Sequence, residues 1–79
     1  MQIQVEVRAY RNGQDVLDGT ITWDGRQLVA DPPNDPFLND LIAEINGDPS
    51  GLEYLHNRYR NAYLRVTAPR QVSAAPVGR

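Results

Sequence analysis

The feature that most limits the fold is a strict two-residue alternation at the start of the chain. Apolar side chains stand at positions 3, 5, 7 and 9, and polar side chains or tyrosine at the even positions of residues 2–10. This period predicts a half-buried β-strand. The dipeptide Asn12-Gly13 follows, and it suits a two-residue type I′ turn, in which both central residues need a positive φ. The first segment therefore predicts a β-hairpin.

The side-chain parity of this hairpin predicts a β-bulge in its second strand. A two-residue turn places Ala9 opposite Val16, so that Val16 faces the core. Ile21 and Trp23 are the next apolar pair, and they have the opposite parity. One extra residue restores the pattern, and we expect it at Asp18-Gly19, because glycine within a strand is typical of a bulge.

A third strand is predicted by the second turn signal, Asp24-Gly25. A two-residue turn there pairs Ile21 with Leu28 in the core. It also pairs Trp23 with Arg26, whose guanidinium we expect to lie over the indole ring. The first 30 residues thus predict a three-stranded antiparallel meander.

Three prolines within residues 32–36 end the meander, since proline has no N–H to donate to a strand ladder. Asp35 suits the N-cap of a helix and Pro36 its first position. The helix is expected to end at Asn46-Gly47, where positive φ is tolerated. Its apolar stripe at helical spacing consists of Phe37, Leu38, Leu41, Ile42 and Ile45.

A second helix begins shortly after the first, and its start has two interpretations. Either Asp48 caps it with Pro49 at the first position, or Ser50 and Glu53 form a capping box. Its core-facing side chains are Leu52, Leu55, His56 and Tyr59.

The end of the second helix is open between two alternatives. A helix that continues to Val66 would expose Leu64, whereas a helix that stops near Asn61 leaves a strand at residues 63–67. We prefer the strand, because asparagine tolerates the left-handed conformation that ends helices. From position 68 on, alanine, proline and arginine follow without a period, so we expect residues 68–79 to be a flexible tail.

Together these elements predict a single α+β domain of residues 1–67 in two layers, with the order βββααβ. The expected core consists of Ile3, Val5, Val7, Ile21, Leu28, Leu38, Leu41, Ile42, Ile45, Leu52 and Leu55. The first strand is long and free of proline, and we expect it to leave an open sheet edge that pairs two copies of the chain into a homodimer. This order of elements is too common to indicate a function.

Several classes of chemistry are excluded by composition. The chain has no cysteine, which removes disulfides, thiolate nucleophiles and cysteine metal sites. The first residues resemble neither a signal peptide nor a membrane span, so a cytoplasmic location and no membrane partner are expected. His56 is the only histidine, and its place on the core-facing stripe indicates a packed side chain bonded to a carbonyl. The acidic runs lack calcium-loop spacing. We therefore expect no enzyme activity, no catalytic residue, no metal and no cofactor.

Charge is divided unevenly along the chain. Residues 1–53 hold all ten acidic residues and three arginines, a net charge of −7, whereas residues 54–79 hold five arginines and no acid, a net charge of +5. The candidate binding residues in the basic part are Tyr54, Arg58, Arg60, Tyr63, Arg65 and Arg70. From helical geometry we assign Arg58 to a partner and Arg60 to a carboxylate within the chain.

Two functions fit this pattern. The first is a small protein-interaction module, such as an adaptor, an inhibitor or an antitoxin-like protein, which binds another protein or its own copy and needs no catalytic residues. The alternative is an accessory nucleic-acid binder, because arginine pairs with phosphates and tyrosine stacks on bases. The sequence pI of about 5.1 is far from that of a dedicated nucleic-acid binder, so we prefer the first.

Overall fold

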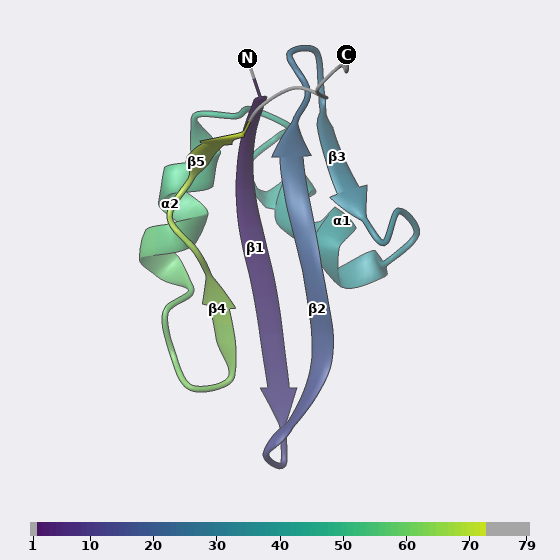
Figure 1. The fold of residues 1–79 in the computed structure, drawn as a ribbon, viewed down its shortest axis with the longest axis vertical. Helices are drawn as coiled ribbons and strands as arrows, with labels where there is room; N and C mark the ends of the chain where they lie inside the picture. Colours follow the sequence, from purple (N-terminus) through teal and green to yellow (C-terminus); the bar gives the residue numbers. More distant parts are fainter. Residues whose placement is uncertain (1, 73–79) are drawn as a thin grey trace, which may run out of the picture.

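The computed structural model describes residues 2–72, and its longest elements are the two strands of the predicted hairpin. Strand β1 is Gln2–Arg11 and strand β2 is Gln14–Trp23, and they pair antiparallel (Figure 1). Asn12 and Gly13 join them with φ values of 54° and 78°. The two-residue turn with positive φ at both positions is therefore confirmed.

Three further strands and two helices complete the fold, a small α+β domain with one antiparallel sheet. They are β3 (Leu28–Asp31), α1 (Pro36–Glu44), α2 (Gly51–Arg58), β4 (Leu64–Val66) and β5 (Arg70–Val72). The predicted meander, the two helices and the strand after them are all present. The predicted order lacks one strand, because β5 follows β4 and makes the sheet five-stranded.

The strand order places β1 inside the sheet. The order is β3-β2-β1-β4, and β5 also pairs with β1. Strand β4 covers residues 7–9 of β1, and β5 covers residues 2–4. The prediction that the first strand offers an open edge was therefore wrong, because the last two strands of the chain return to it.

The same pairing corrects the prediction of a tail that begins at position 68. Arg70 pairs with Gln4 and Val72 with Gln2, so these residues belong to the sheet. A strand of three residues is too short to show a period, which is why the sequence pattern missed it. The rest of the predicted tail, residues 73–79, lies outside the described residues.

The bulge in β2 is real but lies nearer the turn than predicted. Ala9 pairs with Leu17 and Tyr10 with Asp15, so the extra residue is Val16. Gly19 is a regular strand residue opposite Val7. A Cβ atom at Gly19 would lie 2.7 Å from the Asp31 carbonyl oxygen, so this glycine is required by a close backbone approach and not by a bulge.

The register between β2 and β3 also differs from the prediction. Ile21 pairs with Ala30, and Leu28 pairs with Trp23. The shift is two residues, so the core-facing parity is kept, but Ala30 replaces Leu28 as the buried partner of Ile21.

A four-residue loop causes this shift. Asp24 Oδ1 accepts hydrogen bonds from the backbone N–H groups of Arg26 at 2.8 Å and Gln27 at 2.9 Å. Arg26 is thereby held in the loop and is not opposite Trp23. The expected stacking of Arg26 on Trp23 is absent, and within the described residues the one cation–aromatic contact is that of Arg58 with Tyr59.

The helix ends follow their capping residues. Asp35 Oδ1 accepts from the N–H of Phe37 and Leu38, which confirms the predicted N-cap of α1. Asn46 and Gly47 follow α1 with φ values of 57° and 69°. For α2 neither predicted start is confirmed in full. The helix begins at Gly51 with Ser50 at the N-cap position, but the Ser50 side chain makes no capping bond. Asp48 Oδ1 accepts from the Ser50 N–H at 3.0 Å and so holds the turn that precedes the helix.

The predicted strand after α2 is confirmed as β4. Asn61 Oδ1 accepts from the N–H groups of Tyr63 and Leu64, both at 2.8 Å, and reverses the chain. Val66 then faces the core beside Val7, with 1% of its surface exposed.

The core lies between one face of the sheet and both helices. The buried apolar residues are Val5, Val7, Ile21, Ala30, Leu38, Leu41, Ile45, Leu52, Leu55 and Val66. Eight of the predicted core residues are among them. Ile3, Leu28 and Ile42 are only partly buried against the core, because they lie toward its rim. In the part of the chain that is described, neither helix is long and apolar enough to span a membrane.

Candidate functional site

The first hairpin is much longer than the helices that cover it. Ten strand residues extend over about 33 Å, whereas a nine-residue helix is about 13 Å long. The helices therefore cover only part of the inner sheet face, and the hairpin continues beyond them toward its turn (Figure 1). This overhang bounds a groove of about 450 Å³ together with the start of α1 and the chain around β4.

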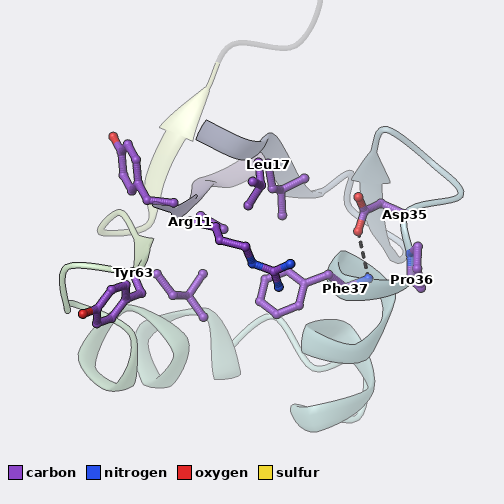
Figure 2. A pocket seen from close by; sticks show the side chains of 10 residues that line it. Arg11, Leu17, Asp35, Pro36, Phe37 and Tyr63 are labelled. Atoms are coloured by element: carbon purple, nitrogen blue, oxygen red, sulfur yellow. Dashed lines mark hydrogen bonds between the residues drawn. The ribbon is translucent and has the colours of Figure 1, made fainter. Parts of the chain in front are cut away.

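We call this hollow the overhang groove. It is lined by the half-buried Ala9, Leu17 and Leu64 and by the exposed Val16, Phe37 and Tyr63. Figure 2 shows Leu17, Phe37 and Tyr63 among the side chains around it. The exposed fractions are 57% for Val16, 37% for Phe37 and 72% for Tyr63. Five large apolar or aromatic side chains are exposed within residues 2–72, so three of the five gather at one place.

Two local features fix the walls of the overhang groove. The bulge at Val16 disturbs the alternation of β2 and brings Val16 and Leu17 to the same groove, which is a common effect of a bulge. On the other side, the Asp35 carboxylate accepts from the N–H of Phe37 at 2.8 Å. This cap determines where α1 begins and therefore where the Phe37 ring stands.

Arg11 gives the overhang groove its charge. It has the same parity in β1 as Val7 and Ala9, so its side chain points to the inner side of the hairpin. Figure 2 shows its guanidinium group extending across the groove toward Phe37. No ion pair of Arg11 is formed within the described residues. The groove is lined mainly by apolar side chains and has two charged groups, the Arg11 guanidinium and the Asp35 carboxylate, and the carboxylate is engaged by the N–H groups of Phe37 and Leu38.

The sequence-based candidates do not form one site. Tyr54 and Arg58 belong to α2, and Arg58 Nη1 donates to the Tyr54 hydroxyl at 2.7 Å. Tyr63 borders the overhang groove. Arg60 and Arg65 pair with each other beside β1, and Arg70 lies farther along the sheet in β5 opposite Gln4.

Arg58 belongs to an internal network. Its Nη1 lies 3.3 Å from Glu44 Oε2, and its guanidinium carbon lies 5.3 Å from the centre of the Tyr59 ring. The Tyr59 hydroxyl donates to Glu44 Oε1 at 2.8 Å. The hydrogen bond with the Tyr54 hydroxyl raises the pKa of Arg58, and burial raises the pKa of Tyr59. This network joins α2 to α1.

Of the two roles assigned from helical geometry, that of Arg58 toward a partner stays a prediction, and that of Arg60 is wrong. Arg58 pairs with a carboxylate of the acidic part of the chain, although 54% of its side chain is exposed. Arg60 was expected to find such a carboxylate, and this was wrong: none lies within 4.0 Å of it in residues 2–72. The helix ends at Arg58, so the helical angle on which the assignment of Arg60 depended does not apply to it.

His56 is a partly buried side chain that holds the backbone, as predicted. Its Nδ1 lies 2.8 Å from the Val66 carbonyl oxygen. A carbonyl oxygen only accepts, so Nδ1 carries the hydrogen. Within the described residues, no group of three or more histidine, aspartate or glutamate side chains is placed to hold a metal ion.

Comparisons of the chain with protein-family models, with curated proteins and with solved structures found no match. The function must therefore be argued from the geometry of the surface.

Sequence reasoning identified Tyr63 as a site residue but did not find Val16, Phe37 or Arg11. The available signal was the length of the elements. A hairpin of two ten-residue strands is longer than either predicted helix, so part of its inner face had to remain uncovered.

Proposed function

We propose that this protein is a small interaction module without enzymatic activity, which binds another protein through the overhang groove. One observation carries this proposal: three of the five exposed large apolar or aromatic side chains surround a single groove. Single exposed apolar residues are ordinary, but a contiguous group of them is typical of a binding surface.

The groove also indicates the chemistry of the partner segment. Phe37 and Tyr63 offer aromatic rings, a residue type enriched at the centres of interfaces. Arg11 extends across the groove without an internal carboxylate. A fitting segment therefore inserts aliphatic or aromatic side chains and places a carboxylate beside Arg11. An adaptor or an inhibitor of another protein would bind in this way, and so would a second copy of the chain.

The test is the substitution Phe37→Ser. Partners are isolated from host extract with the wild type, identified by mass spectrometry, purified and titrated against both proteins. We expect Phe37→Ser to weaken the binding by about 30-fold or more, as expected for a central aromatic contact. Sedimentation of the wild type at tens of micromolar tests the second copy as the partner, and Phe37→Ser should then give the monomer.

Val29→Ser is the matched control. The exposed fraction of Val29 is 41%, similar to the 37% of Phe37. Val29 belongs to β3 and does not border the groove. Val29→Ser should bind as the wild type does. If every purified partner binds Phe37→Ser as tightly as the wild type, and the wild type sediments as a monomer, the overhang groove is not the binding surface.

A further inference from the structure

Three arginines lie side by side across the sheet on the face away from the helices. Arg8 of β1 pairs with Arg65 of β4, and Arg65 pairs with Arg60 in an isolated bridge. Neighbouring strands are about 4.8 Å apart. We call these three residues the arginine row. Val7 and Val66 on either side of the row are buried in the core, so the alternating parity turns Arg8 and Arg65 outward.

The pairing of Arg60 with Arg65 is the close type. Val66 N donates to Tyr59 O at 2.8 Å and Asn61 N to Leu64 O at 3.1 Å. These bonds flank the pair, which makes it a non-hydrogen-bonded pair, and in such pairs the side chains approach most closely. The side chains of Arg60 and Arg65 therefore start from neighbouring positions on the same face.

Little within the chain neutralises the arginine row. Arg8 Nε lies 3.7 Å from Asp18 Oδ1, at one end of the row. Within residues 2–72 no carboxylate lies within 4.0 Å of Arg60 or Arg65, and Arg65 Nε donates only to the Asn61 carbonyl oxygen, at 3.4 Å. Like charges directly opposite each other destabilise a sheet. The adjacent arginines Arg8 and Arg65 therefore do not stabilise the sheet by their charge.

Two shallow depressions border Arg65. One, of about 300 Å³, is lined by Tyr10 and Tyr63 among others. The second, of about 280 Å³, is lined by His56, Arg60 and Thr67. The Thr67 hydroxyl oxygen accepts from the Glu6 N–H at 2.8 Å, so its own hydrogen is free to donate. Aromatic rings thus stand on one side of the row, and hydrogen-bond donors on the other.

We propose that the arginine row binds single-stranded nucleic acid, with phosphates on the guanidinium groups and a base at Tyr10 and Tyr63. Arginine presents a planar fork of donors that matches a phosphate, and tyrosine rings stack on bases of any sequence. An acidic peptide would satisfy the arginines but would make no use of the tyrosines. This site goes beyond the proposed function, because its arginines do not border the overhang groove. Tyr10 and Tyr63 line both the overhang groove and the depression beside Arg65.

The test is the binding of a labelled oligo-uridine of about twelve nucleotides, followed by fluorescence anisotropy at two salt concentrations. Each phosphate contact on a single strand contributes about −0.7 to the slope of log K against log salt, so three contacts give about −2. Arg60→Gln/Arg65→Gln should lower the affinity about tenfold or more and reduce the slope to about −0.7. Tyr10→Ser should weaken binding severalfold with the slope unchanged.

Arg26→Gln is the matched control, because Arg26 is an exposed arginine in the distant β2–β3 loop. It should bind as the wild type does. Amide shifts of the wild type provide a measurement that does not depend on any variant, and they should move at the arginine row and not at residues 24–27. The proposal is overturned if the wild type does not bind, if Arg26→Gln weakens binding equally, or if polyglutamate binds as well and Tyr10→Ser has no effect.

Discussion

Asp48 is an exposed carboxylate that holds the turn directly before α2. Its Oδ1 accepts from both the N–H and the hydroxyl of Ser50, at 3.0 and 2.9 Å. These hydrogen bonds, that from the Ser50 N–H first, lower the pKa of Asp48. A carboxylate with a lowered pKa in the folded state stabilises the protein fully above its unfolded pKa of about 3.9. That contribution is lost as the pH falls through the lower, folded value.

The substitution Asp48→Asn tests this effect, because asparagine keeps an acceptor oxygen but does not titrate. We expect the free energy of unfolding of the wild type to fall more steeply than that of Asp48→Asn as the pH decreases below about 4. The measurement is urea unfolding followed by circular dichroism between about pH 6 and pH 2. Parallel curves for the two proteins would show that the hydrogen bonds of Asp48 do not depend on its charge. The pKa of Asp24 is also lowered, by the N–H groups of Gln27 and Arg26. Asp24 is present in both proteins, so its contribution to the pH dependence is the same in both and does not affect the comparison.

Single residues were predictable where the reason for them is local. Asp35 and Asn12-Gly13 act on their immediate neighbours, and both were predicted correctly. Gly19 was misinterpreted. Its lack of a side chain leaves room for the backbone carbonyl of Asp31, which is twelve residues away in the sequence. A sequence pattern shows that a glycine is present but does not show what approaches it.

At the scale of elements, the first hairpin and α1 were predictable because each is long enough to repeat its apolar pattern several times. Strands β4 and β5 have three residues each, which is less than two full periods of alternation. The sequence predicted β4 only because Asn61 is typical of the end of a helix and the β-branched Val66 is typical of a strand. Neither strand stands alone, and both depend on β1 for their hydrogen bonds.

Helix α1 depends in a similar way on the sheet, since Leu38 and Leu41 are its buried side chains. Leu41 is 3% exposed. We expect Leu41→Ala to lower the free energy of unfolding by about 2 to 5 kcal/mol, because it removes buried methyl groups and leaves a cavity. That is a large share of the stability of a small domain. Urea unfolding monitored by circular dichroism measures it.

Asn39→Ala in the same helix is the control, because Asn39 is exposed. It should change the free energy of unfolding by no more than about 0.5 kcal/mol. A loss below about 1 kcal/mol for Leu41→Ala would mean that the face of α1 has been assigned wrongly.

At the scale of the whole molecule, both proposed binding sites join residues that are far apart in the sequence. Tyr63 was a candidate from the sequence, but Val16 and Phe37 join it only because the hairpin extends past the helices. The uneven charge indicated Arg60 and Arg65. Arg8 belongs to the acidic part of the chain, and only the β1–β4 register brings it to them. Sequence reasoning could name members of each site but not assemble either one.

The closing of the sheet by the last described strand is a property of the whole molecule that truncation can test. Strand β5 pairs residues 70–72 with residues 2–4 at the start of β1. A chain that ends at Pro69 loses these three pairs, and the start of β1 becomes an open edge. At about 0.5 to 1.5 kcal/mol for each net hydrogen bond, we expect a loss of roughly 1 to 4 kcal/mol in the free energy of unfolding. We also expect new self-association that increases with concentration, because an open edge is a template for pairing with another chain.

A chain that ends at Val72 is the matched control for this truncation, since it keeps every described strand. Urea unfolding and sedimentation velocity, each on both proteins, separate the two expected effects. If the chain ending at Pro69 is as stable and as monomeric as the chain ending at Val72, strand β5 neither stabilises β1 nor protects its edge. If it is less stable and associates, and the association remains after Phe37→Ser, then the new contact is made by β1 and is distinct from the overhang groove. The pairing of residues 70–72 with β1 would then protect the start of that strand from association between copies.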